Sequence, residues 1–304
     1  MRRHELTDCE GELLAPLIPR AATGRPRVED RRVINGMVCK IRTGIPWRDL
    51  PERYGPWQTV CTRFRRYALD GVFTRALQQI QSRADAAGDI DWLVQIDSTI
   101  VRAHQHAAAT GRKGGPTGRT NRNDHALGRS RGGLTTKIHP ACDGKGRPLA
   151  LLITPGRRHD STCAQTLLEQ IRVPRTGPGR PRRRPDRVIA DKAYSSRGCL
   201  RRRGIAHTIP EKIGQRRHRH HRGSRGGRPP RFGREIYRSR NTVERCFNLL
   251  KGFRGIATRY EKTATSYEAV VTRASFLLWA RSVGRRTLVP CRASRAGEPF
   301  RSRH

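Results

Sequence analysis

Hydrophobic residues in the first 90 positions recur at the three- and four-residue spacing of helices. The pattern predicts helices over residues 6–17, 31–42 and 57–69, joined by turns rich in glycine and proline. The last of these helices carries three arginines, Arg63, Arg65 and Arg66. Short helices that end in a basic helix are typical of a helix-turn-helix-like DNA-binding domain. The alternative is a helical cap with a basic outer face.

The hydrophobic pattern changes at residue 91, where β-branched and apolar runs begin. Strands are expected over residues 92–101, 187–191 and 206–210, and a hairpin over 134–139 and 148–154, turning at Asp143-Gly. Helices are expected over 161–171, near Leu200, from Tyr237 to Lys251 and over 266–281, whereas residues 104–133 and 215–233 are expected to form loops. We therefore expect a helical domain over 1–90, an α/β domain over 91–284 and a basic tail over 285–304.

The charge balance points to a polyanionic partner. The chain has 64 Lys plus Arg against 25 Asp plus Glu, a formal net charge of +39 spread along its whole length. A coding bias toward arginine would explain the choice of Arg over Lys, but it would not explain the excess of cations. Arg also suits bidentate phosphate contact, so nucleic acid is the expected partner.

Other classes of protein are disfavoured by what the sequence contains. No apolar run reaches the roughly 18 residues of a membrane span, and the first residues resemble no signal peptide, so we expect a cytoplasmic protein without membrane contact. The eight cysteines form no C-x-x-C pair, which favours neither a zinc site nor a disulfide framework.

One helix carries an acid among cations and an aromatic residue. Tyr237, Arg240, Glu244 and Lys251 are offset by 0, 3, 7 and 14 positions, which on a helix places them within a sector about 60° wide. Such a face could hold a metal ion beside a phosphate. An amphipathic helix with a merely solvated polar stripe is the alternative.

Two further carboxylates lie in apolar strands. Asp97 belongs to the first strand and Asp191 ends a later one, and a buried carboxylate is costly unless it is paired or bound to metal. Taken singly, Asp97 could form a turn and Asp191 could pair with Lys192. Together with Glu244 they predict an oxygen-rich pocket for Mg²⁺ or Mn²⁺, with two ions about 4 Å apart suited to phosphoryl transfer. The histidines, by contrast, lack partners at ligand spacing.

The motif Tyr237, Arg240, Glu244, Lys251 resembles the signature of bacterial insertion-sequence DDE transposases of the IS-five family, within the IS-four-like superfamily. Five other stretches are similar to that family and extend the resemblance over about residues 6–281: 44–51, 95–99, 125–137, 190–194 and 255–260. One departure lies in residues 195–204, which look a few residues shorter than the family pattern. A lost turn there would rotate the packing face and could displace Asp191.

The resemblance implies an RNase H-like fold, with a mixed five-stranded sheet in the order 3-2-1-4-5 flanked by helices. It implies that Asp97, Asp191 and Glu244 bind the catalytic metal ions, and that Tyr237, Arg240 and Lys251 hold transposon-end DNA. The implied partners are double-stranded DNA, both terminal inverted repeats and target, and a second copy of the chain in the DNA complex. The helical N-terminal region would read the repeats.

The reaction implied by this resemblance is DNA transposition. Hydrolysis at the ends of the element frees 3′-hydroxyl groups, which then attack target DNA. Two alternatives use the same sequence differently. An RNase H-like nuclease or resolvase would cut without strand transfer, and a catalytically decayed derivative would only bind DNA.

Overall fold

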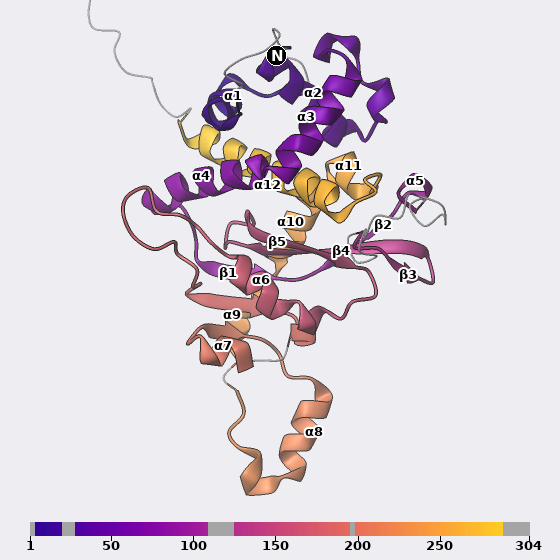
Figure 1. Ribbon diagram of the computed structural model, residues 1–304. Coiled ribbons are helices and arrows are strands. Elements are labelled where there is room, and N and C mark those ends of the chain that lie inside the picture. Colours follow the sequence, from indigo (N-terminus) through magenta and orange to yellow (C-terminus); the bar gives the residue numbers. More distant parts are fainter. Residues whose placement is uncertain (1–3, 20–27, 109–124, 195–197, 231, 288–304) are drawn as a thin grey trace, which may run out of the picture.

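Four helices precede the sheet in the chain. The computed structural model describes residues 4–19, 28–108, 125–194, 198–230 and 232–287 (Figure 1). The helices are α1 (Asp8–Leu14), α2 (Asp30–Thr43), α3 (Trp57–Leu69) and α4 (Val72–Ala86), with 3₁₀ turns η1 (Ala15–Leu17), η2 (Trp47–Asp49) and η3 (Glu52–Tyr54). The expectation that residues 57–69 form the last helix was wrong. Gly71 adopts a left-handed turn at φ 67°, and α4 then buries Val72, Phe73, Ala76, Leu77 and Ile80 at helical spacing.

A mixed sheet forms the centre of the molecule. Its strands are β1 (Leu93–Ile96), β2 (Thr99–Arg102), β3 (Gly128–Ser130), β4 (Gly133–Cys142), β5 (Pro148–Pro155), β6 (Arg187–Ala190) and β7 (Ala206–Thr208). Strand β4 is antiparallel to β5 and β1, and β1 is parallel to β6, which is parallel to β7. When β2 and β3 are left out, the remaining five strands lie side by side as β5-β4-β1-β6-β7. Numbered by their order in the chain, these five strands have the order 3-2-1-4-5. Because β2 and β3 also pair with β4, the sheet described has seven strands rather than the predicted five.

The first predicted strand is interrupted in its middle. Strands β1 and β2 pair with β4 in one unbroken register, from Gln95 opposite Cys142 to Arg102 opposite Thr135. That register sets Asp97 opposite Pro140, and proline has no N–H to donate to a ladder. The pairing therefore lapses at Asp97 and Ser98, which frees this part of the strand from the regular pleat.

Helices cover the sheet and extend beyond it. Helix α6 (Ala164–Gln170), after the turn η5 (Asp160–Thr162), packs on β4 and β5, whereas α10 (Asn241–Lys251) packs on β1 and β4. Figure 1 shows α6 in front of the sheet and α10 behind it. The remaining elements are α5 (Gln105–Ala108), η6 (Lys192–Tyr194), α7 (Gly198–Arg202), α8 (Ile213–His221), η7 (Gly223–Gly226), α9 (Arg234–Arg238), α11 (Arg254–Ala257) and α12 (Ala264–Thr287).

Three expectations about the second half of the chain were wrong. Residues 215–233 are not all loop, because α8 forms there from arginine, glutamine and histidine and projects from the body (Figure 1). Residues 237–251 form two helices, since α9 ends at Arg238 and α10 begins at Asn241. Helix α12 continues to Thr287, so the predicted tail begins within it. Residues 109–124 of the predicted loop over 104–133 lie outside the described part, whereas its ends include α5 and β3.

The N-terminal helices share a core with the sheet. Helix α12 packs between α4 and β5, and buried hydrophobic side chains extend continuously from Leu6 to Ala280. Gln81 of α4 and Trp279 of α12 both donate hydrogen bonds to the carbonyl of Pro148, at 3.0 and 2.7 Å. Both helices thus hold the start of β5. No helix in the described ranges has the length and hydropathy needed to span a bilayer.

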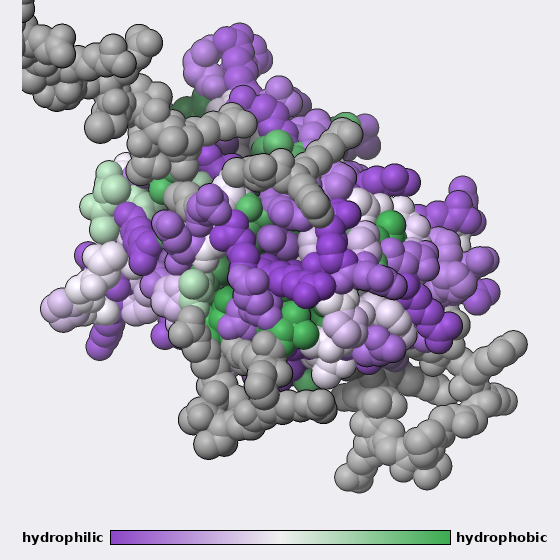
Figure 2. All heavy atoms as spheres, turned by 90° about the horizontal axis from the view of Figure 1, so that it is seen from above, coloured by the Kyte–Doolittle hydropathy of each residue, from purple (hydrophilic) through white to green (hydrophobic). Residues whose placement is uncertain are grey.

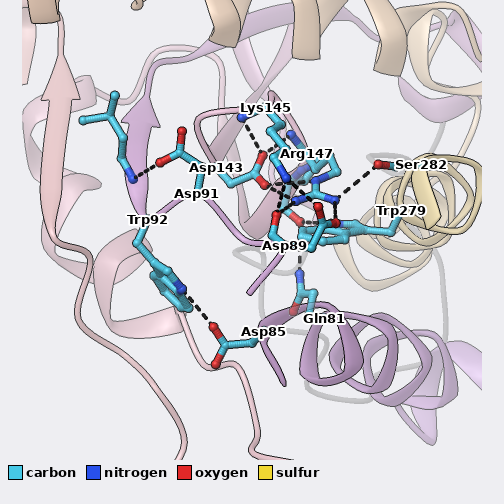
Figure 3. A network of polar contacts seen from close by, with 12 residues as sticks. Gln81, Asp85, Asp89, Asp91, Trp92, Asp143, Lys145, Arg147, Trp279 and Ser282 are labelled. Atoms are coloured by element: carbon cyan, nitrogen blue, oxygen red, sulfur yellow. Dashed lines mark hydrogen bonds and ion pairs between the residues drawn. The ribbon is translucent and has the colours of Figure 1, made fainter. Parts of the chain in front are cut away.

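A buried polar network fastens the β4–β5 turn beside these helices (Figure 3). Arg147 donates to Asp143 Oδ2 from Nη2 and to Asp89 Oδ2 from Nη1, both at 2.6 Å. Its guanidinium also lies 3.9 Å from the ring centroid of Trp279. From above, hydrophilic side chains cover most of the visible face and leave only small apolar patches (Figure 2).

Candidate active site

Two of the predicted acids stand at the same step of adjacent strands. Strands β1 and β6 are parallel, and their register runs from Leu93 opposite Arg187 to Ile96 opposite Ala190. One residue further along each strand stand Asp97 and Asp191. Neighbouring strands are about 4.8 Å apart, so the two backbones bring these carboxylates to one edge of the sheet. Up to Ala190 the register of β6 with β1 is regular, and residues 195–197 of the stretch that looks short against the family pattern lie outside the described residues.

Asp97 is largely buried and charged groups surround it. Its side chain is 14 % exposed, and its Oδ1 accepts a hydrogen bond from the Ser98 N–H at 2.8 Å. Burial raises the pKa of the Asp97 carboxyl, whereas the Ser98 N–H and the Arg240 guanidinium oppose the rise, and Glu244 adds to it. Glu244 therefore lies within electrostatic reach of Asp97.

Arg240 links the strand acids to the helix acid. It stands at the N-cap position of α10, and its Nη2 donates to Asp97 Oδ2 and lies 3.8 Å from Glu244 Oε1. Burial lowers the pKa of Arg240, but Asp97, Tyr237 and Asp191 outweigh burial and raise it. The Arg240 guanidinium thus interacts electrostatically with all three predicted acids.

Tyr237 joins this cluster, whereas Lys251 lies farther along the helix. Burial raises the pKa of the Tyr237 hydroxyl, and Asp191 and Asp97 raise it further against the opposing charge of Arg240. Lys251 ends α10, two turns or about 10 Å beyond Glu244. Seven residues is close to two full turns, so Glu244 and Lys251 share a face of α10, whereas the break at residues 239–240 separates Tyr237 from that helix.

The three acids differ in how much water they meet. Asp97 is largely buried and Asp191 is partly buried, whereas the Glu244 side chain is 49 % exposed. Among the described residues, no group of three or more His, Cys, Asp or Glu side chains gathers closely enough to hold a metal ion. The chemistry of these side chains nevertheless fits a hard divalent cation, because their donors are carboxylate oxygens. Two of the carboxylates, Asp97 and Glu244, already have the positive charge of Arg240 beside them.

A buried network behind the acids was not anticipated from the sequence. His139 hydrogen-bonds Thr154 Oγ1 through Nε2 at 2.9 Å and faces the Tyr194 hydroxyl through Nδ1 at 3.4 Å. Tyr194 in turn hydrogen-bonds Ser98, the residue after Asp97. Burial lowers the pKa of His139 to about 4, which keeps the imidazole neutral at pH 7. The sequence feature that could have indicated this network is His139, the one polar residue in the apolar run at 138–142.

The three arginines of α3 have different surroundings. Arg63 is held inward, where it pairs with Asp30 at 3.1 Å and donates to the Val28 carbonyl at 3.0 Å. Arg65 and Arg66 are exposed, and only Arg66 has an acidic neighbour, with Nε 3.6 Å from Asp70. Arg65 and Arg66 are therefore accessible to a partner, whereas Arg63 is not.

Comparison with known proteins identifies two matching family models. Residues 90–279 match the model described as the transposase DDE domain, and residues 6–77 match one described for transposases of the IS4/5 family. The first match covers more than half of the chain and includes the three acids. No solved structure matches the chain.

Individual relatives agree with these models. The chain is 33 % identical over 151 residues to a protein of Brucella ovis named for the transposase of insertion sequence element IS6501, covering 49 % of this chain and 100 % of that protein. It is 32 % identical over 137 residues to a Burkholderia cepacia protein named for the IS402 transposase, covering 44 % and 57 %. A Sinorhizobium fredii protein of uncharacterized function is 39 % identical over 117 residues, covering 36 % and 90 %.

Proposed function

The chain belongs to the IS4/5 family of DDE transposases, and from that premise we propose that it moves an insertion element by cutting and joining DNA. The proposed reaction is hydrolysis at the ends of the element, followed by attack of the freed 3′-hydroxyl groups on target DNA. The sheet path β5-β4-β1-β6-β7, with β4 antiparallel, supports an RNase H-like catalytic domain.

One observation carries the proposal. Asp97 and Asp191 follow paired positions on parallel strands, and Arg240 connects Asp97 to Glu244. These three carboxylates would hold Mg²⁺ or Mn²⁺, which when bound would activate a water or 3′-hydroxyl and neutralise charge on the phosphate. The role of Arg240 follows from its double contact: it keeps two like charges close together and can turn to a phosphate when DNA arrives.

The surrounding side chains would position the DNA. Tyr237, which lies within electrostatic reach of Asp97 and Asp191, and Lys251, two turns beyond Glu244 on α10, would contact the strand on either side of the reacting phosphate. Arg65 and Arg66 on α3 would contact the duplex backbone within the terminal repeats. We propose that two copies act together in the DNA complex, since an element has two ends.

The test uses purified protein, Mg²⁺, duplexes from the flanking ends of the element and a target plasmid, with sequencing of the joints. Asp97→Asn, Asp191→Asn and Glu244→Gln should each lower joint formation by more than about 100-fold, because each removes a carboxylate placed to hold a metal ion. Gel-shift affinity for the ends should be retained. Glu235→Gln is the matched control, because Glu235 is an exposed carboxylate on α9 that pairs with Arg238.

The outcomes separate the parts of the proposal. Joint formation that survives all three substitutions would remove the catalytic assignment. Cleaved ends that never appear in the plasmid, at any target concentration, would leave a nuclease in place of a transposase.

A further inference from the structure

Asp97 and Asp191 stand just beyond the regular pairing of their strands. The pairing of β1 with β6 ends at Ile96 and Ala190, and the pairing of β1 with β4 lapses over Asp97 and Ser98. Ladder hydrogen bonds therefore fix the strands up to the acids but not the residues that carry them. Side chains that bind a metal ion must be held within about 0.5 Å of the productive geometry, so other contacts have to supply this precision.

Tyr194 contacts the segments of both acids. It ends the turn η6, which begins directly after Asp191, and its N–H donates to the Asp191 carbonyl at 2.9 Å. Its hydroxyl hydrogen-bonds the side chain of Ser98, the residue after Asp97. Tyr194 belongs to the stretch 190–194 and Ser98 to the stretch 95–99. Two of the sequence motifs thus meet through a pair of residues to which the acid cluster itself gives no role.

The Tyr194 hydroxyl also meets strands β4 and β5. His139 Nδ1 lies 3.4 Å from this hydroxyl, and His139 Nε2 hydrogen-bonds Thr154 Oγ1 at 2.9 Å. The Thr154 hydroxyl donates to the Pro155 carbonyl at 3.5 Å, so it accepts from Nε2–H. A neutral imidazole has a single N–H, which leaves Nδ1 to accept from Tyr194. The tyrosine hydroxyl thus donates to β4 and accepts from Ser98.

The residues of this chain of hydrogen bonds are shielded from water. Tyr194, His139 and Thr154 are 2 %, 0 % and 1 % exposed. Burial raises the pKa of the Tyr194 hydroxyl, which therefore keeps its proton. Hydrogen bonds are stronger in such a buried, low-dielectric setting, and water cannot replace a lost partner. The sheet thus provides a fixed anchor, from which Tyr194 reaches the segments of both acids.

We propose that Tyr194 is a positioning residue of the candidate active site, which holds Asp97 and Asp191 at the separation that a divalent cation requires. It touches neither metal nor DNA and acts through the side chain of Ser98 and the backbone of Asp191. A buried network needed only for stability could lie anywhere in the core, whereas this one closes the gap in the ladder at the two acids. The inference rests on the proposed function, because it takes both carboxylates to be metal ligands.

The test removes the hydroxyl and keeps the ring, by Tyr194→Phe in the full chain. Binding of Mn²⁺ alone is measured by titration, with free Mn²⁺ followed by electron paramagnetic resonance. The dissociation constant should rise about 10- to 100-fold, the usual effect of losing a residue that orients metal ligands. In the joint-formation assay the Mn²⁺ concentration that gives half the maximal rate should rise by the same factor, while the rate at saturating Mn²⁺ falls less.

Tyr267→Phe is the matched control. Tyr267 is a fully buried tyrosine of α12 whose hydroxyl donates to the Ile256 carbonyl at 2.8 Å. Its charged neighbours are Arg259 and Glu261 rather than the acids of the site. Both variants lose one buried hydroxyl and should lower the unfolding midpoint alike, but only Tyr194→Phe should weaken Mn²⁺ binding.

A second variant tests the contact itself. Ser98→Ala should also weaken Mn²⁺ binding, and combining it with Tyr194→Phe should add little, because both remove the same hydrogen bond. The inference fails if Tyr194→Phe leaves Mn²⁺ affinity unchanged, or if Tyr267→Phe weakens it equally. The transposase assignment survives either result as long as Asp97→Asn abolishes joint formation. If Asp97→Asn instead leaves both Mn²⁺ binding and joint formation intact, the proposed function fails and the inference fails with it.

Discussion

Replacing Arg147 with methionine tests the buried network beside the β4–β5 turn (Figure 3). Methionine keeps apolar contact with the Trp279 ring but removes every side-chain hydrogen bond from residue 147 to Asp89 and Asp143. Arg147, Asp89 and Asp143 are 6 %, 9 % and 0 % exposed, so water cannot replace the lost partner. Removing one member of a buried ion pair costs about 3–5 kcal/mol of unfolding free energy. For a chain of this size the melting temperature should fall by roughly 10 °C.

The pKa values of Asp143 and Asp89 determine in which direction the stability loss of Arg147→Met changes with pH. Burial raises the pKa of Asp143 even with Arg147 present, whereas Asp89 has a lowered pKa because Lys145 and Arg147 outweigh its burial. Without Arg147 the pKa of Asp143 rises further, so the folded variant keeps that proton at a pH where the unfolded chain has released it. Stability of the variant relative to wild type then falls as pH rises from about 4. Below that pH the deficit should be smallest.

Urea unfolding of both proteins at pH 4 and pH 7 measures the effect. Arg147→Lys should fall between them, because lysine retains the charge without the forked geometry. Arg238→Met is the control, since Arg238 pairs with Glu235 on the surface and should leave the midpoint unchanged. A deficit below about 1 kcal/mol at pH 7, or one that does not shrink at pH 4, would refute the reasoning.

Three further predictions concern the candidate site. Arg240→Gln removes a charge that opposes the raised pKa of Asp97, so the acid limb of the pH–rate profile for end cleavage should move to higher pH; an unmoved limb would exclude this coupling. The His139 pKa of about 4 lies below its unfolded value, so wild-type stability should rise by about 3 kcal/mol between about pH 4 and 6.5, and His139→Gln should lack that rise in unfolding measurements. Arg65→Gln and Arg66→Gln should each reduce the slope of log affinity for DNA against log salt concentration by about 1. Arg63→Gln should instead lower the unfolding free energy, because it loses the pair with Asp30. Equal slopes in all three variants would contradict the assignment.

Much of the local structure was predictable because periodicity is a local property. The helices at 31–42 and 57–69 and the hairpin turning at Asp143-Gly are confirmed, since apolar spacing and turn residues act within a few positions. Helix α4 was overlooked although Val72, Phe73, Ala76 and Leu77 carry the same periodicity. Helix α8 could not be found this way, because none of its residues is buried and it has no apolar face.

The site was predictable in its chemistry but not in its arrangement. Carboxylates in apolar strands and an acid between cations on a helix identified Asp97, Asp191 and Glu244 as candidates. The break between α9 and α10 was not visible, and neither was the pairing of Arg240 with Asp97, which lie 143 positions apart in the chain. The inward turn of Arg63 likewise depends on Asp30 from another helix.

The sequence by itself determined which side chains are available and where several of the helices and strands lie, because hydrophobic spacing and turn residues act locally. Only the tertiary structure decided that β1 and β6 pair in the register that sets Asp97 beside Asp191, and that Pro140 opens the ladder there. It also decided that residues 44–51 and 255–260 enclose one cavity with Lys40. These outcomes depend on contacts between residues far apart in the chain, which the packing of the whole core selects.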